Sequence, residues 1–244
     1  MRLARTLSIA IVVVACTTPP PLQPARRIPA DVIQPIVDRI RHEAAQRISL
    51  RGLARVKVDS ESTSGSVQEV IVVERPDRLR LEMRSFFGRT QAVLVTEGGR
   101  YAYYEGGVVE RGPLARDVIR QRLGLDLTAE EAVETLLAAA DLDPKPTREA
   151  LLVGDEHWVE TGSRRIRIGT DGDLRGITAL DPEGGVRWRA EYSRWRDLDG
   201  ERYPFTVRLV FPETGVTAEL ALRDVELNPS LDPEVFQLKV DSPR

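Results

Sequence analysis

Cysteine, histidine and aromatic residues are scarce in this sequence of 244 residues, and each scarcity excludes a kind of chemistry. The chain has one cysteine, Cys16, so it cannot form an internal disulfide. Its two histidines, His42 and His157, are far apart and belong to no cluster of metal-ligating residues. The sequence contains no Gly-x-Ser-x-Gly elbow and no phosphate-binding glycine loop. We therefore expect no catalytic site, no metal and no cofactor.

Two groups of acidic residues resemble functional sites but fit simpler roles. Asp171 and Asp173 lack the remaining ligands of a calcium loop, so a tight turn is the expected structure. Glu130, Glu131 and Glu134 lie in a segment with helical spacing, where we expect them to form the solvated face.

An excess of charge of one sign is also missing. The 35 basic and 38 acidic residues are mixed along the chain, and the net charge is -3. A protein that binds a phosphate backbone needs a contiguous basic surface, so nucleic acid is not an expected partner. Hydrophobic residues make up 41% of the chain, which is enough to bury a core.

The N-terminus carries the pattern of an export signal. Two arginines precede the apolar run LSIAIVVVA (residues 7–15), which is too short to span a bilayer. Residues 1–15 are therefore expected to be a lipoprotein signal peptide, because VVA before Cys16 resembles the lipobox of bacterial lipoproteins, whose cysteine is acylated. The alternatives are an ordinary signal peptide beside a chance cysteine, or an uncleaved anchor.

Residues 16–30 are rich in proline and show no periodicity, which predicts an extended tether between the lipid anchor and the folded domain. Residue 17 is threonine. Because an aspartate there favours inner-membrane retention in enterobacterial lipoproteins, the resemblance implies an outer-membrane protein that faces the periplasm.

Residues 31–244 are expected to form one domain. Apolar residues spaced three or four apart from Ile33 to Ala44 predict an N-terminal helix, and a period of two begins after Gly52. Alternating runs occupy residues 53–111 and again residues 150–227, joined by short turns that favour antiparallel neighbours.

The segment between these runs, about residues 114–140, has helical spacing, and Thr128 with Glu131 forms a capping-box pattern. The expected fold class is α+β with a single large antiparallel, strongly curved sheet. We expect an unclosed β-barrel of about eleven strands, whose concave face is covered by the N-terminal helix and by this central helical insertion as a lid.

Two of the chain's five phenylalanines lie side by side at an expected hairpin turn in RLRLEMRSFFGRTQAVL, residues 78–94. Adjacent residues of a strand face opposite ways. We therefore expect Phe86 to pack against the barrel, and Phe87, beside the flexible Gly88, to project and contact membrane or cargo.

The lipobox, the tether, the helix and the two sets of strands around a helical insertion together resemble the LolA/LolB superfamily of lipoprotein carriers. The arginine-rich strand that ends in an apolar tip before Gly88 is closest to the LolB-like outer-membrane members. The resemblance implies an apolar cavity under a lid of helices. It also implies that Phe87 occupies the protruding position that these members need to insert lipoproteins into the membrane.

We thus expect a non-catalytic outer-membrane lipoprotein that binds acyl chains or lipids and helps deliver lipoproteins or lipids to the membrane. Its expected partners are the membrane, this cargo and a periplasmic LolA-like donor, and the protein is expected to be a monomer. The alternative function is an envelope sensor, interaction or assembly-scaffold lipoprotein. The candidate cavity residues, for each of which a filled core is the alternative, are Leu79, Leu81, Met83, Val93, Val133, Leu136, Leu137, Trp188, Tyr192, Phe205 and Val207.

Overall fold

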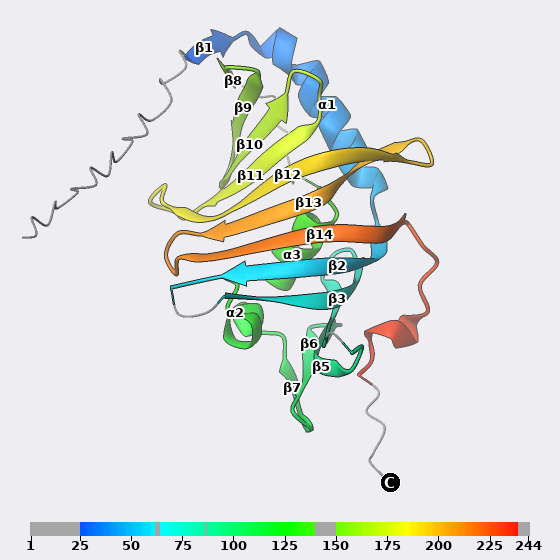
Figure 1. Cartoon of the computed structure of the whole chain (residues 1–244). Helices are drawn as coiled ribbons and strands as arrows, with labels where there is room; N and C mark the ends of the chain where they lie inside the picture. Colours follow the sequence, from blue (N-terminus) through cyan, green and yellow to red (C-terminus); the bar gives the residue numbers. More distant parts are fainter. Residues whose placement is uncertain (1–24, 62–63, 86, 140–149, 239–244) are drawn as a thin grey trace, which may run out of the picture.

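The structure is a computed structural model that describes residues 25–61, 64–85, 87–139 and 150–238. Fourteen strands form one sheet in the order β1-β8-β9-β10-β11-β12-β13-β14-β2-β3-β4-β5-β6-β7. Neighbouring strands run antiparallel. The outer strands β1 and β7 are not paired with each other, so the curved sheet remains an unclosed barrel (Figure 1).

The chain builds this sheet from two meanders. The strands before the helical insertion are β1 (Ala25–Ile28), β2 (Ser49–Asp59), β3 (Ser64–Glu74), β4 (Arg78–Arg84), β5 (Thr90–Glu97), β6 (Arg100–Glu105) and β7 (Val108–Pro113). Those after it are β8 (Ala150–Val153), β9 (Glu156–Thr161), β10 (Arg164–Gly169), β11 (Leu174–Leu180), β12 (Val186–Leu198), β13 (Glu201–Phe211) and β14 (Val216–Leu227). The last strand, β14, pairs with β2, with Leu220 opposite Val56, and this pairing joins the two meanders.

Turn chemistry explains the short connections between strands. Asp199 and Gly200, between β12 and β13, have φ angles of 54° and 90°. Both central residues of a type I′ turn need positive φ, and such a turn matches the right-handed twist of a hairpin. An Asp-Gly pair adopts this backbone at little cost.

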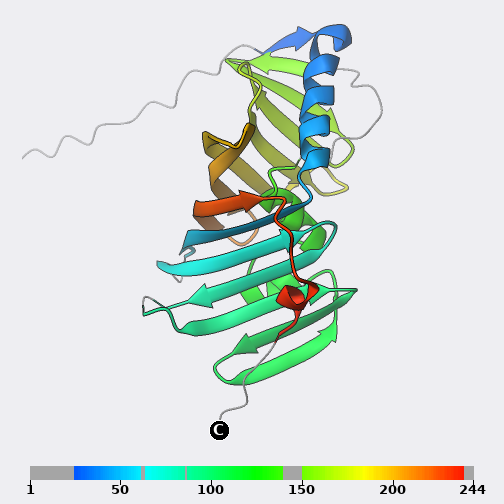
Figure 2. The ribbon, with the colours of Figure 1, turned by 90° about the vertical axis from the view of Figure 1, so that its right-hand side faces the viewer.

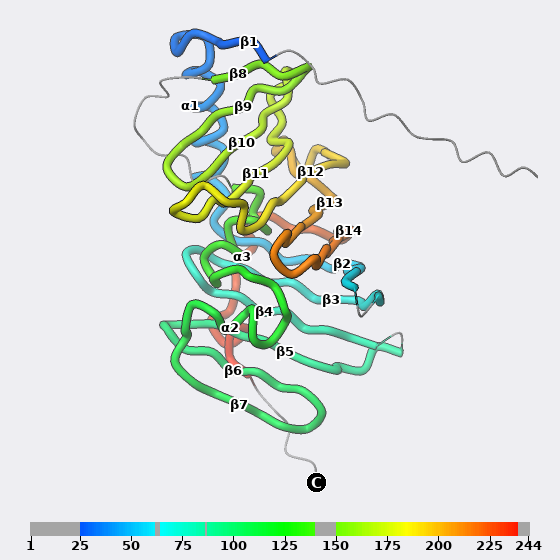
Figure 3. The backbone as a smooth tube through the Cα atoms, turned by 90° about the vertical axis from the view of Figure 1, so that its left-hand side faces the viewer, coloured from blue at the N-terminus to red at the C-terminus, as the bar shows by residue number. Residues whose placement is uncertain are grey.

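The helices lie against the sheet. Helix α1 (Ala30–Gln46) runs beside the strands of the second meander and buries Ile33, Val37, Ile40 and Ala44 (Figure 2). Helices α2 (Val118–Leu123) and α3 (Ala129–Leu136) lie over the inner face of the first meander (Figure 3). A short 3₁₀ helix, η1 (Pro233–Phe236), contacts β4 and β5. The inward side chains of both meanders and of α1, α2 and α3 share one hydrophobic core.

The structure confirms the predicted fold class and lid. It differs in two details of the sheet. There are fourteen strands instead of about eleven. Residues 25–28, expected to belong to the tether, form β1 and pair with β8. Their sequence ARRI has no apolar alternation, so only the unpaired edge of β8 favours the extended structure.

Candidate functional site

An apolar cavity of about 250 Å³ lies between the sheet and the helices α2 and α3. Strands β2, β3, β4, β6, β13 and β14 form one wall, and α2, α3 and the loop between them form the other. The volume is close to the lower end of the range for small-molecule sites. The aliphatic lining includes Val56, Val58, Leu81, Met83, Leu123 and Leu136.

Strand alternation explains why the inner wall is apolar. On β2, Val56 and Val58 line the cavity, whereas Arg55 and Lys57 between and beside them are exposed. A period of two sends each set of side chains to one face of the sheet. Helix α3 closes the cavity from the opposite side, because it packs against β3 and β4.

The N-terminal end of α3 is held by its capping box and by buried ion pairs. Glu131 N–H donates to Thr128 Oγ1 (3.1 Å), and Thr128 N–H donates to Glu131 Oε2 (3.0 Å), which confirms the predicted box. The expectation that Glu131 is solvated is wrong: the residue is 8% exposed. Arg187 and Arg164 reach its carboxylate at 2.9 Å and 3.3 Å. Burial opposes ionisation, but the hydrogen bonds from Arg187 and Thr128 outweigh it and lower the pKa of Glu131.

The C-terminal end of α3 is held by donors from the sheet and from Arg47, the residue that follows α1. The last carbonyl groups of a helix have no partner within the helix. Tyr192 and Tyr203 donate their hydroxyl hydrogen bonds to the carbonyl groups of the last two residues of α3. Just beyond the helix, Arg47 Nη1 donates to the carbonyl oxygen of Ala138 at 3.0 Å.

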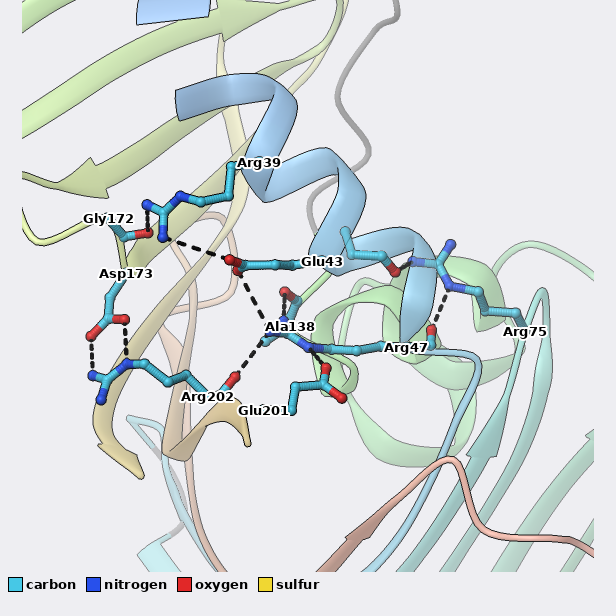
Figure 4. Close-up of polar contacts among 10 residues, drawn as sticks. Arg39, Glu43, Arg47, Arg75, Ala138, Gly172, Asp173, Glu201 and Arg202 are labelled. Atoms are coloured by element: carbon cyan, nitrogen blue, oxygen red, sulfur yellow. Dashed lines mark hydrogen bonds and ion pairs between the residues drawn. The ribbon is translucent and has the colours of Figure 1, made fainter. Parts of the chain in front are cut away.

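Arg47 is the centre of a polar cluster that joins α1, the lid and β13 (Figure 4). The residue is 3% exposed. Its Nε donates to Glu201 Oε1 at 2.7 Å, and its Nη2 donates to the carbonyl oxygen of Arg202 at 2.9 Å. Arg75 Nε donates to the carbonyl oxygen of Arg47 at 3.0 Å. The lid helix α3 is therefore fixed at both ends.

Helix α2 has weaker polar attachments than α3. It buries Ile119 and turns Leu123 toward the cavity. Its Arg122 pairs with Glu110 of β7 and donates to Tyr101 Oη at 3.3 Å. The side chain of Glu110 is 45% exposed, and exposed pairs contribute at most about 1 kcal/mol. The segment around α2 is thus the most weakly attached part of the cavity wall.

Glu69 interrupts the apolar lining. It occupies an inward position of β3, between Ala54 on β2 and Met83 on β4, and neither of those side chains is a hydrogen-bond donor. The residue is 7% exposed, and burial raises the pKa of its carboxyl group to about 7. Within the described part of the chain, its carboxyl group has no hydrogen-bond or ion-pair partner. On the opposite wall, Thr135 Oγ1 is also buried without a partner in that part of the chain.

The β4–β5 hairpin carries the candidate tip. Phe87 is 87% exposed, the highest value for a large apolar residue among those described. The turn is closed by hydrogen bonds from Ser85 N–H to the oxygen of Arg89 (2.8 Å) and from Gly88 N–H to the oxygen of Ser85 (2.9 Å). Gly88 has a φ of 76°, which glycine adopts without strain. Phe86 lies outside the described residues.

A second exposed apolar residue lies at the same end of the sheet. Val108, 63% exposed, pairs with Glu105, and Glu105 pairs with Ala92 near the start of β5. Glu105, which is exposed, also lines the cavity, as do the partly exposed Val58 and Met83 at the ends of β2 and β4 that face this side. The cavity therefore reaches the surface at this end. The open end of the cavity and the exposed apolar tips thus belong to one end of the sheet.

The candidate cavity residues fall into three groups. Those that line the cavity are Leu81, Met83 and Leu136. Those buried in the surrounding core, outside the lining, are Leu79, Val133, Leu137, Trp188, Tyr192, Phe205 and Val207. Val93 lies on the other face of the sheet.

Val93 packs with Val95 and Ala102 on the outer face, against Leu238. Its neighbour Leu94 faces the main core instead. Residues 92–95 are apolar throughout, so alternation cannot identify the inward set. The C-terminal segment covers this part of the outer face, which is why both faces of β5 are apolar.

Sequence reasoning missed Glu69, Tyr103 and the leucines that follow α2 as cavity residues. For Glu69 a signal was present. Glu69 alternates in step with Val67 and Ile71, so the period of two places its carboxyl group on the apolar face of the strand.

The described residues contain no group of three or more His, Cys, Asp and Glu that could hold a metal. Residues 169–173 form a tight turn, in which Gly172 N–H donates to the oxygen of Gly169 at 2.8 Å. Asp173 pairs with Arg202 at 2.6 Å. In the same part of the chain, no helix combines the length and the apolar character that a membrane span requires.

Solved structures with the same architecture identify the fold. A LolA superfamily protein from Nitrosomonas europaea superposes with a TM-score of 0.58 at 13% identity, over 86% of this chain and 98% of that one. This chain has a LolA-like fold. A domain named as an outer membrane lipoprotein-sorting protein, from Vibrio parahaemolyticus, has a TM-score of 0.57 at 9% identity, over 85% of this chain and 97% of its own.

A DUF1329 family protein from Desulfovibrio piger also superposes on this chain, with a TM-score of 0.54 at 12% identity over 86% of this chain and 97% of that one. No protein-family model and no curated protein matches the sequence. The likeness therefore concerns the fold, and it agrees with the unclosed barrel and inner helices predicted from the sequence.

Proposed function

We propose that this protein is a lipoprotein of the outer membrane, lipidated at Cys16, that binds acyl chains in its cavity and helps deliver lipoproteins or lipids to the membrane. The observation that carries the proposal is the apolar cavity of about 250 Å³ under α2 and α3. The proposed role is non-catalytic, uses no cofactor, and places the protein in the cell envelope facing the periplasm, where a LolA-like carrier would be its donor.

Burial alone gives such a cavity affinity for an acyl chain. Removing apolar surface from water contributes about 25 cal/mol per Å². The lining is mainly aliphatic, and on strands β2 and β4 the outward residues that alternate with it are charged. Delivery then requires only that the bilayer hold the chain more tightly than the cavity does.

The attachments of the two lid helices indicate where a chain enters. Helix α3 is fixed at both ends by buried donors and ion pairs, whereas α2 is attached through an exposed ion pair. We infer that α2 and the loop after it move aside, while α3 stays in place. Because the open end of the cavity lies beside Phe87 and Val108, a membrane at that end would meet apolar side chains first.

A second candidate function is an envelope sensor or assembly scaffold, and it is supported by the filled interior of the barrel around β12 and β13. Around β12 and β13, large side chains such as Trp188, Tyr203 and Phe211 are fully buried. The apolar cavity on which the carrier role depends lies in the half of the barrel beneath α2 and α3. Occupancy of that space distinguishes the two functions.

Substitution of Met83 by tryptophan tests the carrier function. Met83 lines the cavity and is only partly buried, so a larger ring can enter the space without displacing the central core. We expect Met83→Trp to weaken binding of a fluorescent, uncharged alkyl probe by about tenfold or more, because a methylene group contributes about 0.8 kcal/mol and the ring excludes several of them. Titration of the probe into purified protein measures this.

Val210→Trp provides the matched control. Val210 is partly buried and alternates with the inward Leu209 and Phe211, so its side chain lies on the outer face of β13. This variant should bind the probe as the wild type does. If neither wild type nor control binds, or if Met83→Trp binds equally well, the cavity is not an acyl-chain site and the scaffold function is favoured.

A further inference from the structure

Glu69 differs from the other buried carboxylates of the described chain. Glu82, Glu131 and Asp173 are each about as buried as Glu69, and each is paired with at least one arginine. Glu69 has neither an arginine nor another donor within the described residues. Burying a carboxyl group without a partner costs free energy. The fold itself therefore gives no reason for a carboxyl group at this position.

A second polar atom without a partner lines the same cavity. Thr135 lies on α3, which packs against β3, the strand of Glu69. Its Oγ1 is buried and makes no hydrogen bond within the described chain. Two polar groups that face one apolar cavity from opposite walls, each without a protein partner in the described chain, indicate a ligand whose polar end serves both.

The charge of the lining selects the kind of polar end. The ionisable groups that line the cavity with Glu69 are Tyr103 and Glu105 from β6 and Arg122 from α2. Arg122 is paired with Glu110, and burial raises the pKa of Tyr103 to about 12, so the phenol stays neutral. The Nε of Arg122 is also buried without a hydrogen-bond partner in the described chain, but Glu110 neutralises the charge of its guanidinium group. The cavity thus offers a carboxylate without a counter-charge and no cation without one.

We propose that the cavity takes an aliphatic ligand that ends in an ammonium group, which the carboxylate of Glu69 and the hydroxyl oxygen of Thr135 receive as hydrogen-bond acceptors. The inference rests on the proposed function of the cavity as an acyl-chain site and adds a polar specificity to it. Ammonium groups close to aliphatic chains occur in the headgroups of amino-phospholipids and at the free α-amino group of a diacylated cysteine.

Binding of such a ligand depends on pH in a defined direction. Burial raises the pKa of Glu69 to about 7, so its charged form is lost as pH falls below that value. The ligand's ammonium group keeps its charge over the same range. Affinity for an alkylamine should therefore fall by up to about tenfold for each pH unit below 7, until the pKa of Glu69 in the complex is passed. An uncharged chain should show no such loss.

Three probes with the same alkyl chain test the inference: decylamine, decanol and decanoate, each below its micelle concentration and each competing with a fluorescent alkyl probe. At pH 8 the wild type should bind decylamine about ten- to a hundredfold more tightly than decanol, the range expected for a charge-assisted hydrogen bond. Decanoate should bind most weakly. Equal binding of decylamine and decanol to the wild type would overturn the inference.

Variants separate the role of Glu69 from that of charge in general. Glu69→Gln keeps the size of the side chain and should bring decylamine to the affinity of decanol, with decanol itself little changed. Glu105→Gln removes the exposed carboxylate of the same lining and should change decylamine binding by less than about twofold, as expected for a solvated charge. Thr135→Val should weaken decylamine about threefold to tenfold, the effect of one hydrogen bond. A Glu69→Gln protein that keeps its preference for the amine refutes the role of Glu69.

The outcome also distinguishes this inference from the proposed function. If decanol binds and decylamine binds no more tightly, the cavity is still an acyl-chain site and only the ammonium specificity is refuted. Failure of all three probes removes both. Two natural classes of ammonium ligand are then compared, a diacylated cysteinyl peptide and a short-chain phosphatidylethanolamine, and the one that binds more tightly identifies the source of the ammonium group. The N-acetylated form of the peptide, which lacks the ammonium group, is the control.

Discussion

The carboxyl group of Glu69 couples the stability of the fold to pH. Burial raises its pKa from 4.5 to about 7, so between these values the folded protein holds a proton that the unfolded chain has released. Because the folded state then binds more protons, stability falls as pH rises from 4.5 to 7 and stays reduced above 7. At 1.36 kcal/mol for each pKa unit, the loss is about 3 kcal/mol.

Glu69→Gln should therefore stabilise the protein in a pH-dependent way. The amide is neutral at every pH, so we expect the variant to gain about 3 kcal/mol over the wild type at pH 8 and to differ little from it at pH 4.5. Urea unfolding at both pH values measures the difference. Glu105→Gln, on an exposed residue, should give no such trend. A gain for Glu69→Gln that is the same at both pH values would mean that its carboxyl group titrates normally.

Helix α3 shows which parts of an element a sequence can specify. Its start was predictable, because Thr128 and Glu131 form a capping box through local hydrogen bonds alone. The burial of Glu131 was not, because Arg187 and Arg164, which pair with it, come from strands that follow the helix in the chain. Partners that are remote in sequence change a solvated position into a buried one.

Strand β5 shows the same limit for a sheet. Its apolar character was predictable, but its faces were not, because Val93 and Val95 are covered by Leu238, which lies far along the chain. In β4 alternation was sufficient, because the outward residues Arg80, Glu82 and Arg84 are charged and the inward Leu81 and Met83 line the cavity. Periodicity identifies the inner face only where the two sides of the strand differ in polarity.

The anchoring of α3 can be tested through Arg47, which is 3% exposed and donates to a carbonyl just beyond the helix. Arg47→Met removes these hydrogen bonds and leaves buried acceptors without donors. We expect a loss of about 3–5 kcal/mol in the free energy of unfolding, the usual cost of breaking a buried ion pair. We also expect faster amide hydrogen exchange in α3, since the end of the helix is released.

Arg51→Met serves as the matched control for this variant. Arg51 also pairs with a glutamate, Glu226, but both side chains are more than half exposed, at 54% and 52%. Its loss should cost less than about 1 kcal/mol and should leave exchange in α3 unchanged. Equal costs for the two substitutions would show that Arg47 does not anchor the lid.

The two halves of the barrel are filled differently. Around β12 and β13, the indole of Trp188 and the rings of Tyr203 and Phe211 occupy the interior, and Tyr203 also binds the end of α3. Beneath α2, the inward residues of β2 and β14 are smaller, such as Val56 and Ala218, and space remains. Alternation predicted that both Trp188 and Leu81 line the cavity, because it indicates only which face of the sheet a residue occupies. The volume left between two faces depends on their separation, which no local pattern contains.

The open end of this cavity and the exposed apolar tips define the side on which the molecule would meet a membrane. Phe87 and Val108, 87% and 63% exposed, lie at this end, and the apolar outer face of β5 is covered by Leu238. Ile48, 55% exposed, precedes the opposite end of β2 and provides a control site of similar character. The proposed role in delivery therefore depends on this end of the molecule.

Phe87→Glu should separate delivery from folding. Inserting a phenylalanine ring into an apolar environment contributes about 1.5–3 kcal/mol, so its loss should slow transfer of an acylated protein to liposomes by about ten- to a hundredfold. The free energy of unfolding should change by less than about 0.5 kcal/mol, because the replaced side chain is exposed. Ile48→Glu should transfer normally. Labelling with a palmitate analogue, which must disappear in Cys16→Ala, first establishes that the proteins compared carry their anchor. If Phe87→Glu unfolds, the ring belongs to the core. If Ile48→Glu slows transfer as much as Phe87→Glu does, the effect comes from added surface charge, and the tip has no special role in delivery.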